Sequence, residues 1–383
     1  PVTCSPDDTL ADVDRLCGRY RISGVPVVDA GHVLVGIVTN RDMRFEEDMT
    51  RRVRDVMTPM PLVTGRTGMA GDEALDLLRR HKIEKLPLVD SSGRLTGLIT
   101  VKDYVKSDRY PLATKDSSGR LMVGAAVGVG EDAYKRSMAL VEAGVDVLIV
   151  DTAHGHQVAV LDMVRQLKRD TDIQIVGGNV ATRGGAQALV DAGADAVKVG
   201  VGPGAMCTTR VMTGVGRPQF SAVWECAAAA REAGANVWAD GGVRHPRDVA
   251  LALAAGASSV MLGSLLAGTY ESATDLLFDA SGRAYKENYG MASRRAVAGR
   301  TRADKAMDQA RKQLFEEGIS SSRYYVDPIR PGVEDLMDQI VAGVRSAFTY
   351  AGARSVSEFW DRAVVGVQSA AGYSEGLPRP TNE

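Results

Sequence analysis

One cysteine, Cys207, follows a glycine-rich stretch of the sequence, where its side chain could take part in chemistry. The stretch VKVGVGPGAMCTTR, residues 197–210, begins as an apolar strand, turns through Gly200, Gly202 and Gly204, and ends on Cys207 and three further polar residues. A thiolate is a strong nucleophile and a competent leaving group, so it can divide one difficult substitution into two easier steps. The other common use of a lone cysteine is as a small buried apolar side chain. Glycines allow such a loop to turn and to approach a ligand closely.

The composition limits what this cysteine could act on. The chain has 383 residues, of which 45% are hydrophobic and 25% charged, which is typical of globular proteins with two or more domains. A formal net charge of -2 gives no general attraction for nucleic acid. The four cysteines have no paired spacing, which predicts reduced thiols. No apolar run reaches about 18 residues, so we expect a cytoplasmic protein with no membrane span and no nucleic-acid partner.

The first part of the chain repeats itself with an offset of 61 residues, so that Thr39 matches Thr100 and Asp42 matches Asp103. Each copy is expected to form a helix, two short strands, and a second helix that begins at a Thr-x-x-Asp sequence. A hydroxyl and a carboxylate three residues apart can cap a helix. The same two groups can also bind the neighbouring hydroxyls of a ribose, and both interpretations stay open. Each copy resembles a CBS domain.

After Lys115 the sequence alternates between strands and helices. Apolar strand candidates lie at 121–128, 145–153, 173–181, 196–202, 236–242 and 258–266. Ala-rich helical stretches between most of them end at a glycine. This alternation predicts an α/β fold with a parallel sheet, and the Gly, Asn and Asp residues at the strand ends favour a (β/α)8 TIM barrel. Six strands are two fewer than that barrel needs, so either two strands precede residue 1 or the sheet is open.

The motifs of this second part resemble those of the IMP dehydrogenase/GMP reductase family. They are DTAHGH, GGNVAT, GVGPGAMCTTR, ADGGVRHPRDVALALAAGA and GSLLAGT, in that order. The resemblance implies a TIM barrel with a tandem CBS-domain pair inserted after its second strand, so the first two strands would lie upstream of this sequence. It implies CBS domains at 1–50 and 51–110, and a catalytic barrel at 115–383 with a flap at about 291–330.

The resemblance also implies roles for individual residues. Cys207 would attack C2 of a purine nucleotide and form a covalent adduct. The nucleotide would be bound by Asp240 at its ribose, by Gly241, Gly242, Gly263 and Ser264 at its phosphate, and by Tyr289, Gly290 and Met291 along its base. Asp151, Asn179, Gly200, Val201 and Gly202 would face a nicotinamide cofactor, and the carbonyls of Gly202, Gly204 and Cys207 would hold K⁺. Ala205 stands where the family usually has a serine, so one hydroxyl contact to the phosphate is absent.

Two opposite reactions occur in this family. IMP dehydrogenases pass a hydride to NAD and hydrolyse the adduct with an Arg-Tyr pair that precedes an EG sequence in the flap. GMP reductases expel ammonia, which a threonine and a flap glutamate protonate, and they reduce C2 with NADPH. Thr209 and Glu317 stand at the reductase positions, and the pair Arg323-Tyr324 follows Glu317. We therefore expect a GMP reductase that uses NADPH, with an IMP dehydrogenase that uses NAD as the alternative.

The CBS pair keeps further possibilities open. It is typical of IMP dehydrogenases, and it would also suit a non-catalytic nucleotide sensor. The resemblance implies that Thr39, Asp42, Thr100 and Asp103 contact an adenine or guanine nucleotide, and that the chain forms a homotetramer or octamer. His154 and His156 are candidate metal ligands, but no third ligand is patterned with them, so we expect no catalytic metal.

Overall fold

The structure is a computed structural model that describes residues 1–383 except 21, 292, 301–317 and 379–383. The chain divides into two compact units, Pro1–Lys115 and Asp116–Glu383. The second unit begins with a turn, in which Oδ1 of Asp116 accepts hydrogen bonds from the N–H groups of Ser118 (2.9 Å) and Arg120 (2.8 Å). This turn is the DSSGR sequence at which the residue pattern changes from the repeat to the strand–helix alternation.

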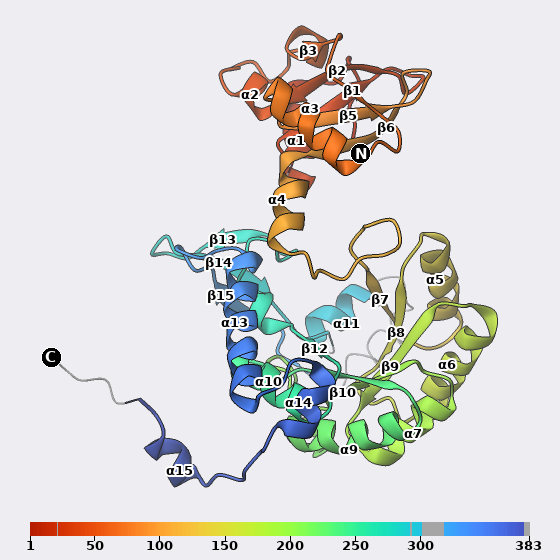
Figure 1. Ribbon diagram of the computed structural model, residues 1–383, viewed down its shortest axis with the longest axis vertical. Helices are drawn as coiled ribbons and strands as arrows, with labels where there is room; N and C mark the ends of the chain where they lie inside the picture. The colour runs from red at the N-terminus through yellow and green to blue at the C-terminus, as the bar shows by residue number, and fades with distance from the viewer. Residues whose placement is uncertain (21, 292, 301–317, 379–383) are drawn as a thin grey trace, which may run out of the picture. The chain divides into compact units, whose positions relative to one another are not determined.

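The first unit contains two copies of one arrangement (Figure 1). The first copy has α1 (Leu10–Tyr20), β1 (Gly24–Val28), β2 (Leu34–Thr39), α2 (Asn40–Met43), η1 (Val53–Asp55) and β3 (Thr58–Pro59). The second has β4 (Gly65–Arg66), α3 (Gly71–His81), β5 (Lys85–Val89), β6 (Leu95–Thr100) and α4 (Val101–Arg109). The sheets have the orders β1-β2-β3 and β4-β5-β6. Gly24 pairs with Thr39 in the first hairpin, and Lys85 pairs with Thr100 in the second, so the repeat extends to the strand register.

Each Thr-x-x-Asp sequence caps the helix that follows it. Oδ2 of Asp42 accepts hydrogen bonds from the backbone N–H (2.8 Å) and the hydroxyl (2.7 Å) of Thr39. Asp103 does the same for Thr100, at 2.8 and 2.9 Å. These reciprocal bonds form capping boxes at the first residues of α2 and α4. The capping interpretation of the repeat is therefore confirmed, and each aspartate keeps a second oxygen outside the box.

The second unit is built on a curled sheet of six parallel strands in the order β12-β11-β10-β9-β8-β7. The strands are β7 (Gly124–Val127), β8 (Val147–Asp151), β9 (Gln174–Val180), β10 (Ala196–Val199), β11 (Asn236–Asp240) and β12 (Ser259–Met261). The connecting helices are α5 (Glu131–Glu142), α6 (Val158–Asp170), α7 (Arg183–Asp191), α9 (Gln219–Glu232) and α10 (Pro246–Ala254). Figure 1 shows α5, α6, α7 and α9 along the outer side of the sheet. All six predicted strands are present, in one partial barrel.

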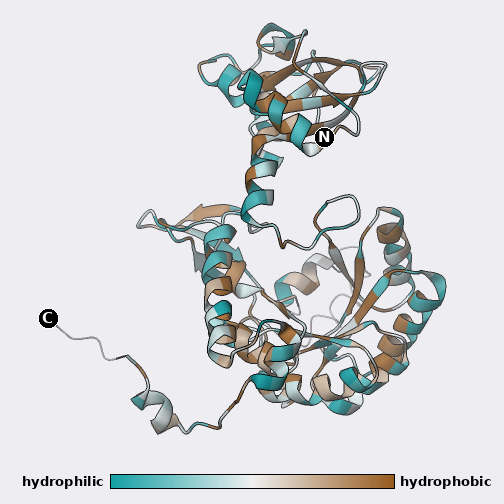
Figure 2. Ribbon diagram, viewed as in Figure 1, coloured by the Kyte–Doolittle hydropathy of each residue, from teal (hydrophilic) through white to brown (hydrophobic). Residues whose placement is uncertain are grey.

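Period-two alternation divides the strand residues between the two faces of this sheet. Leu148 and Val150 of β8 and Val197 of β10 belong to the large core that the outer helices cover. Ile149 of β8 and Val176 of β9 form a small cluster on the opposite, concave face. Strands that are apolar on both faces are typical of parallel sheets, and Figure 2 shows them as largely hydrophobic ribbons. Because the outer helices cover the convex face, polar side chains that several strands bring together lie on the concave face.

The rest of the second unit follows the last parallel strand. It comprises η2 (Ser264–Leu266), the antiparallel strands β13 (Leu276–Phe278), β14 (Ala284–Asn288) and β15 (Ser322–Tyr325), and the helices α11 (Arg294–Arg300), α13 (Val333–Ala351), α14 (Val356–Arg362) and α15 (Ala370–Glu375). Buried Lys286 of β14 donates to the carbonyls of Ser272 (2.8 Å) and Thr274 (2.6 Å). Among the described residues, no helix is both long and apolar enough to cross a membrane.

Candidate active site

The loop after β10 presents Cys207 to solvent. Its side chain is exposed, and its N–H donates to the carbonyl of Gly204 at 3.1 Å. The thiol donates to the hydroxyl oxygen of Thr209 at 3.1 Å. Thr209 is the first residue of the short helix α8 (Thr209–Thr213) and is only 8% exposed. The loop therefore holds a reachable sulfur beside a shielded hydroxyl.

The glycines of this loop are required by close approaches of the backbone. Gly200 has φ +148°, and a Cβ there would lie 2.0 Å from the carbonyl oxygen of Asp240. Gly202 has φ +85° and packs against the Arg210 side chain. Arg210 in turn donates to the carbonyl of Val201 at 3.3 Å and to that of Arg217. Arg210 thus joins the start of the loop, at Val201, to Arg217 beyond α8, a role that its place next to the CTT sequence did not reveal.

The other three cysteines are buried. Desolvation raises the pKa of Cys4 and of Cys226 to about 12, and it also raises the pKa of Cys17. These thiols are held in their neutral form and are poor nucleophiles at physiological pH, because the thiolate is the reactive species. Cys207 is therefore the cysteine suited to chemistry.

Two later segments of the chain converge on the cysteine loop. The carbonyl of Met206 accepts a hydrogen bond from the N–H of Ile319 at 3.0 Å, and Ile319 accepts one from Gly290 at 2.9 Å. Gly318 has φ +139°, and a Cβ built on it would lie 3.2 Å from the Met206 carbonyl. Gly290 thus connects the segment expected along the base to this junction, with Tyr289 before it and the exposed Met291 after it in the chain. Glu317 lies outside the described residues, directly before Gly318 in the sequence.

The residues expected at the ribose and phosphate follow β11 and β12. Gly241 and Gly242 have φ values of +90° and +82° and lie against Pro203 of the cysteine loop. Gly263 has open space where a side chain would be, and Ser264 begins η2. A cavity of about 800 Å³ has Ser264 in its wall. Its wall includes Ala205, Val243, Arg244, Tyr324, Arg330 and Asp335. The loops after β10, β11 and β12 therefore meet around one cavity.

Carboxylates from β8 and β11 share a buried lysine on the concave face. Lys198 of β10 is 2% exposed and pairs with Asp240, and its Nζ lies 3.3 Å from Oδ1 of Asp151. Asn179 of β9 donates from Nδ2 to Asp240 Oδ2 (2.9 Å) and to the Gly200 carbonyl (2.7 Å). The predicted residues Asp151, Asn179 and Asp240 are thus brought together. Lys198 was not predicted, although a lysine inside an otherwise apolar strand was a signal for it.

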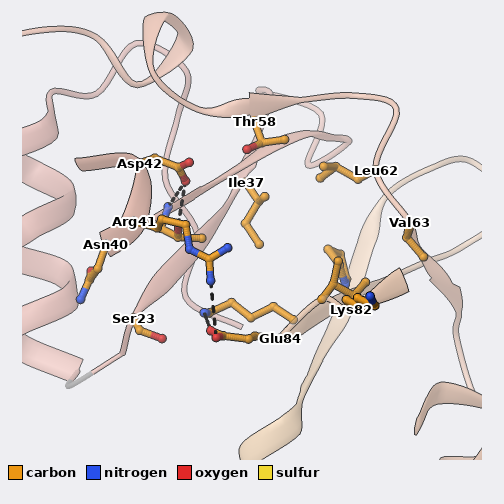
Figure 3. Close-up of a pocket in the computed structure, with 14 residues that line it drawn as sticks. Ser23, Ile37, Asn40, Arg41, Asp42, Thr58, Leu62, Val63, Lys82 and Glu84 are labelled. Carbon is orange, nitrogen blue, oxygen red and sulfur yellow. Dashed lines mark hydrogen bonds and ion pairs between the residues drawn. The ribbon is translucent and has the colours of Figure 1, made fainter. Parts of the chain in front are cut away.

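A second candidate site lies within the first unit, between the two copies of the repeat (Figure 3). This pocket of about 340 Å³ is lined by Thr39, Arg41 and Asp42 of the first copy and by Lys82 and Lys85 of the second, among others. Arg41 and Lys85 both lie near Glu84, at 3.6 and 3.8 Å. The lining therefore mixes hydroxyls and three cations with the carboxylates of Asp42 and Glu84. Thr100 and Asp103 do not line this pocket.

Comparison with known proteins assigns the family. The sequence profile of the IMP dehydrogenase / GMP reductase domain matches residues 30–379, and that of the CBS domain matches residues 1–47. The chain belongs to the IMP dehydrogenase/GMP reductase family. Within this family it is an NAD(P)-dependent oxidoreductase. The profile covers both the cysteine loop and the carboxylate–lysine cluster.

Relatives with both activities resemble the chain. It is 54% identical to an inosine-5'-monophosphate dehydrogenase of Mycobacterium tuberculosis over 99% of this chain and 72% of the relative. It is 52% identical to a GMP reductase of the same species over 99% of this chain and 79% of the relative. A crystal structure of a GMP reductase variant from Trypanosoma brucei with guanosine 5'-monophosphate superposes with a TM-score of 0.79 at 36% identity, covering 100% of this chain and 79% of that one. Overall similarity therefore does not separate the two reactions.

Proposed function

We propose that this protein is a GMP reductase, which converts GMP and NADPH to IMP, NADP and ammonia. The observation that carries the proposal is the convergence at Met206. Gly318, the residue after Glu317, lies against the carbonyl that immediately precedes Cys207. The Thr209 hydroxyl lies 3.1 Å from the sulfur. These contacts support a proposed pair of Thr209 and Glu317 that acts at the nucleophile.

Cys207 acts as the nucleophile in this reaction. Its sulfur bonds to C2 of GMP, the bond from C2 to the exocyclic nitrogen breaks, and ammonia leaves. The nicotinamide cofactor, when bound, supplies the hydride that C2 then receives. The bond between C2 and sulfur breaks with its electron pair returning to sulfur, which restores the Cys207 thiolate and releases IMP.

Departure of ammonia needs a proton on the leaving nitrogen, and Thr209 and Glu317 supply it. Thr209 is 8% exposed and its hydroxyl is adjacent to the sulfur, so it can pass a proton to the nitrogen on C2. Glu317 acts as the donor that reloads this hydroxyl. Proton transfer by positioned side chains contributes about 10²- to 10⁴-fold to rates.

The alternative is an IMP dehydrogenase, favoured by the slightly higher identity to such relatives, 54% against 52%. That reaction requires an Arg-Tyr pair to activate water at the adduct. Arg323 and Tyr324 belong to β15, where they pair in register with Glu287 and Lys286. The Arg323 guanidinium also lies 4.9 Å from the centre of the Tyr285 ring. The Arg323 guanidinium is thus engaged with a ring, which supports the reductase, while Tyr324 lines the cavity that contains Ser264. The exposed Cys207 argues against a non-catalytic sensor.

The nucleotide subsite in this proposal follows the predicted residues. Asp240 binds the ribose hydroxyls. Gly241, Gly242, Gly263 and Ser264 bind the phosphate, and Tyr289, Gly290 and Met291 border the base. Ala205 and Ser264 line the same cavity as Arg244 and Arg330, and the carboxylates of Asp327 and Asp335 also line it. The two arginines support phosphate binding where Ala205 supplies no hydroxyl.

The cofactor subsite lies beside Asp151, Asn179, Gly200, Val201 and Gly202. Oδ1 of Asn179 is buried and lacks a hydrogen-bond partner in the described part of the chain, so this acceptor fits an amide N–H such as that of a nicotinamide carboxamide. Backbone carbonyls are suitable ligands for K⁺, and those of Gly202, Gly204 and Cys207 would hold it and stiffen the loop. Replacing K⁺ with Na⁺ is expected to lower turnover.

Two assays in K⁺ buffer test the reaction. One contains GMP with NADPH and the other IMP with NAD, and both follow the near-ultraviolet absorbance of the reduced cofactor. Oxidation of NADPH with release of ammonia, lost in Cys207→Ala and Glu317→Gln, supports the reductase. Formation of NADH from IMP would instead establish the dehydrogenase reaction. A residue other than Glu317 would then act as the base that hydrolyses the adduct.

The remaining predictions concern assembly and regulation. We propose CBS domains at 1–50 and 51–110 and a catalytic domain at 115–383 that completes an eight-stranded barrel in the whole protein. An adenine or guanine nucleotide binds the CBS pair through Thr39, Asp42, Thr100 and Asp103. Adding ATP or GTP to the assay tests for regulation, and mass photometry tests for the homotetramer or octamer.

A further inference from the structure

A lysine occupies the interior of the parallel sheet. Lys198 lies between Val197 and Val199 in β10, and its exposed fraction is only 2%. Its neighbours on the strand face the helix-covered core, so alternation directs Lys198 to the concave face. Burying an ammonium is costly unless carboxylates and hydrogen bonds compensate it. The position therefore needs an explanation beyond packing.

The register of the sheet explains how the side chain of Lys198 on β10 reaches Asp151 on β8, two strands away. Lys198 pairs with Gly178 of β9, and Asp151 of β8 pairs with the same Gly178. A Cβ at Gly178 would lie 2.6 Å from Cβ of Lys198. Because Gly178 has no side chain, the lysine crosses β9 unobstructed and its Nζ comes within 3.3 Å of Asp151 Oδ1.

The same ammonium also orients Asp240 at the end of β11. Oδ2 of Asp240 is paired with Lys198 and accepts a further hydrogen bond from Asn179 Nδ2 at 2.9 Å. Both donors act on one oxygen, so the carboxylate is fixed with its Oδ1 left for a ligand. The side chain of Asp240 is 23% exposed and that of Asp151 42% exposed, so each carboxylate is accessible on its outer side.

We propose that Lys198 is a positioning residue that couples the nucleotide subsite to Asp151 by sharing one positive charge between two carboxylates. The inference rests on the proposed function only in taking Asp240 as the group that binds the ribose. Without the ammonium, the carboxylates of Asp151 and Asp240 lose the cation that lies between them and repel each other, and Asp240 turns away from the orientation that the ribose needs. Neutralising Asp151 then removes the repulsion and restores part of the binding.

Calorimetric titration of the full chain with GMP and with IMP tests this coupling without any turnover. Lys198→Met is expected to weaken nucleotide binding by about tenfold or more, because it leaves a carboxylate without its partner. The double variant Lys198→Met/Asp151→Asn keeps the net charge of the wild-type cluster and is expected to bind about threefold or more tightly than the single variant. Lys198→Arg is expected to bind within about threefold of the wild type.

Lys168→Met is the matched control. Lys168 also pairs with an aspartate, Asp195 at 3.0 Å, but it belongs to α6 outside the site, and its loss should leave nucleotide affinity unchanged. A purely structural role for Lys198 would not be relieved by Asp151→Asn.

The outcomes separate the inference from the proposed function. Wild-type protein that binds neither nucleotide would overturn the proposed function. Wild-type protein that binds, with Lys198→Met binding equally well, would overturn the inference alone, as would a double variant no tighter than the single one. If circular dichroism finds Lys198→Met unfolded, Lys198→Gln replaces it in the same comparison with the same expected order.

Discussion

The thiol of Cys207 donates a hydrogen bond to the hydroxyl of Thr209, with 3.1 Å between sulfur and oxygen. The two residues are fixed relative to each other because Thr209 begins α8 while Cys207 ends the glycine loop. We predict that Thr209→Val lowers kcat for GMP reduction by about 10²-fold or more, because valine keeps the shape and removes the proton-transferring group. NADPH oxidation measures the loss. Thr209→Ser, which retains a hydroxyl, should recover much of the rate, and equal losses in both variants would contradict a proton-transfer role.

Gly318 joins the segment after Glu317 to the cysteine loop. Its φ of +139° is unfavourable for other residues, and a Cβ there would press on the Met206 carbonyl from 3.2 Å. Gly318→Ala is therefore expected to displace this segment and to lower kcat by about tenfold or more, with little change in melting temperature. Gly299→Ala is the control, because a Cβ at Gly299 meets nothing within 4 Å. Similar kinetics in the two variants would show that the contact with Met206 is dispensable.

The four cysteines should differ in reactivity. Cys207 is exposed, whereas Cys4, Cys17 and Cys226 are buried. Brief treatment of the native protein with iodoacetamide at neutral pH should alkylate Cys207 and leave the others unmodified, because buried neutral thiols react slowly. Mass spectrometry of the peptides measures the labelling, and urea-unfolded protein supplies the fully labelled reference. Early labelling of Cys226, which is a buried residue of α9, would contradict its burial in the native protein.

Burial of Cys226 also predicts a dependence of stability on alkaline pH. The pKa of this thiol rises from 9.0 to about 12 on burial, so the folded state holds a proton that the unfolded state has lost. The stabilisation is complete below pH 9 and declines as the pH rises toward 12. Thermal unfolding monitored across this range should show a shallower decline for Cys226→Ala. An unchanged slope would mean that other groups govern the alkaline loss.

The capping boxes predict local stability in the first unit. Asp42→Ala and Asp103→Ala each remove the hydrogen bonds that close a helix start, at a cost of about 1 kcal/mol. Amide hydrogen exchange at 39–43 or 100–104 should become about fivefold faster in the affected copy. Asp76→Ala, which removes only a surface pair with Arg80, should change exchange little. Unaltered exchange in both capping variants would show that the boxes are energetically minor.

Much of the site's scaffold could be predicted from local sequence. The six strands are visible as apolar runs, and the glycines of 197–210 mark a loop that needs close backbone approach. The strands are shorter than predicted, because ladder pairing covers only part of each apolar run; β7, for example, comprises Gly124–Val127 of the predicted 121–128. Site residues whose position depends on a single local segment could therefore be predicted from the sequence.

The carboxylate–lysine cluster could not be predicted in the same way. Lys198 and Asp240 are 42 residues apart, and their meeting depends on strand order and on the shared register with Gly178. Neither property follows from the composition of a single strand. The catalytic role of Glu317 and the choice between the two reactions stay predictions, because Glu317 lies outside the described residues.

The outer strands of the parallel sheet have a practical consequence. In the described part of the chain, β7 and β12 each pair with one neighbour. Beside β7, Leu121, Met122 and Val123 have exposed fractions of 65%, 42% and 58%. Unpaired backbone groups next to exposed apolar side chains are a template for aggregation. A purified sample of this polypeptide will therefore lose monodispersity as it is concentrated, unless another strand covers that edge, and dilute solutions are the suitable form for storage and titration.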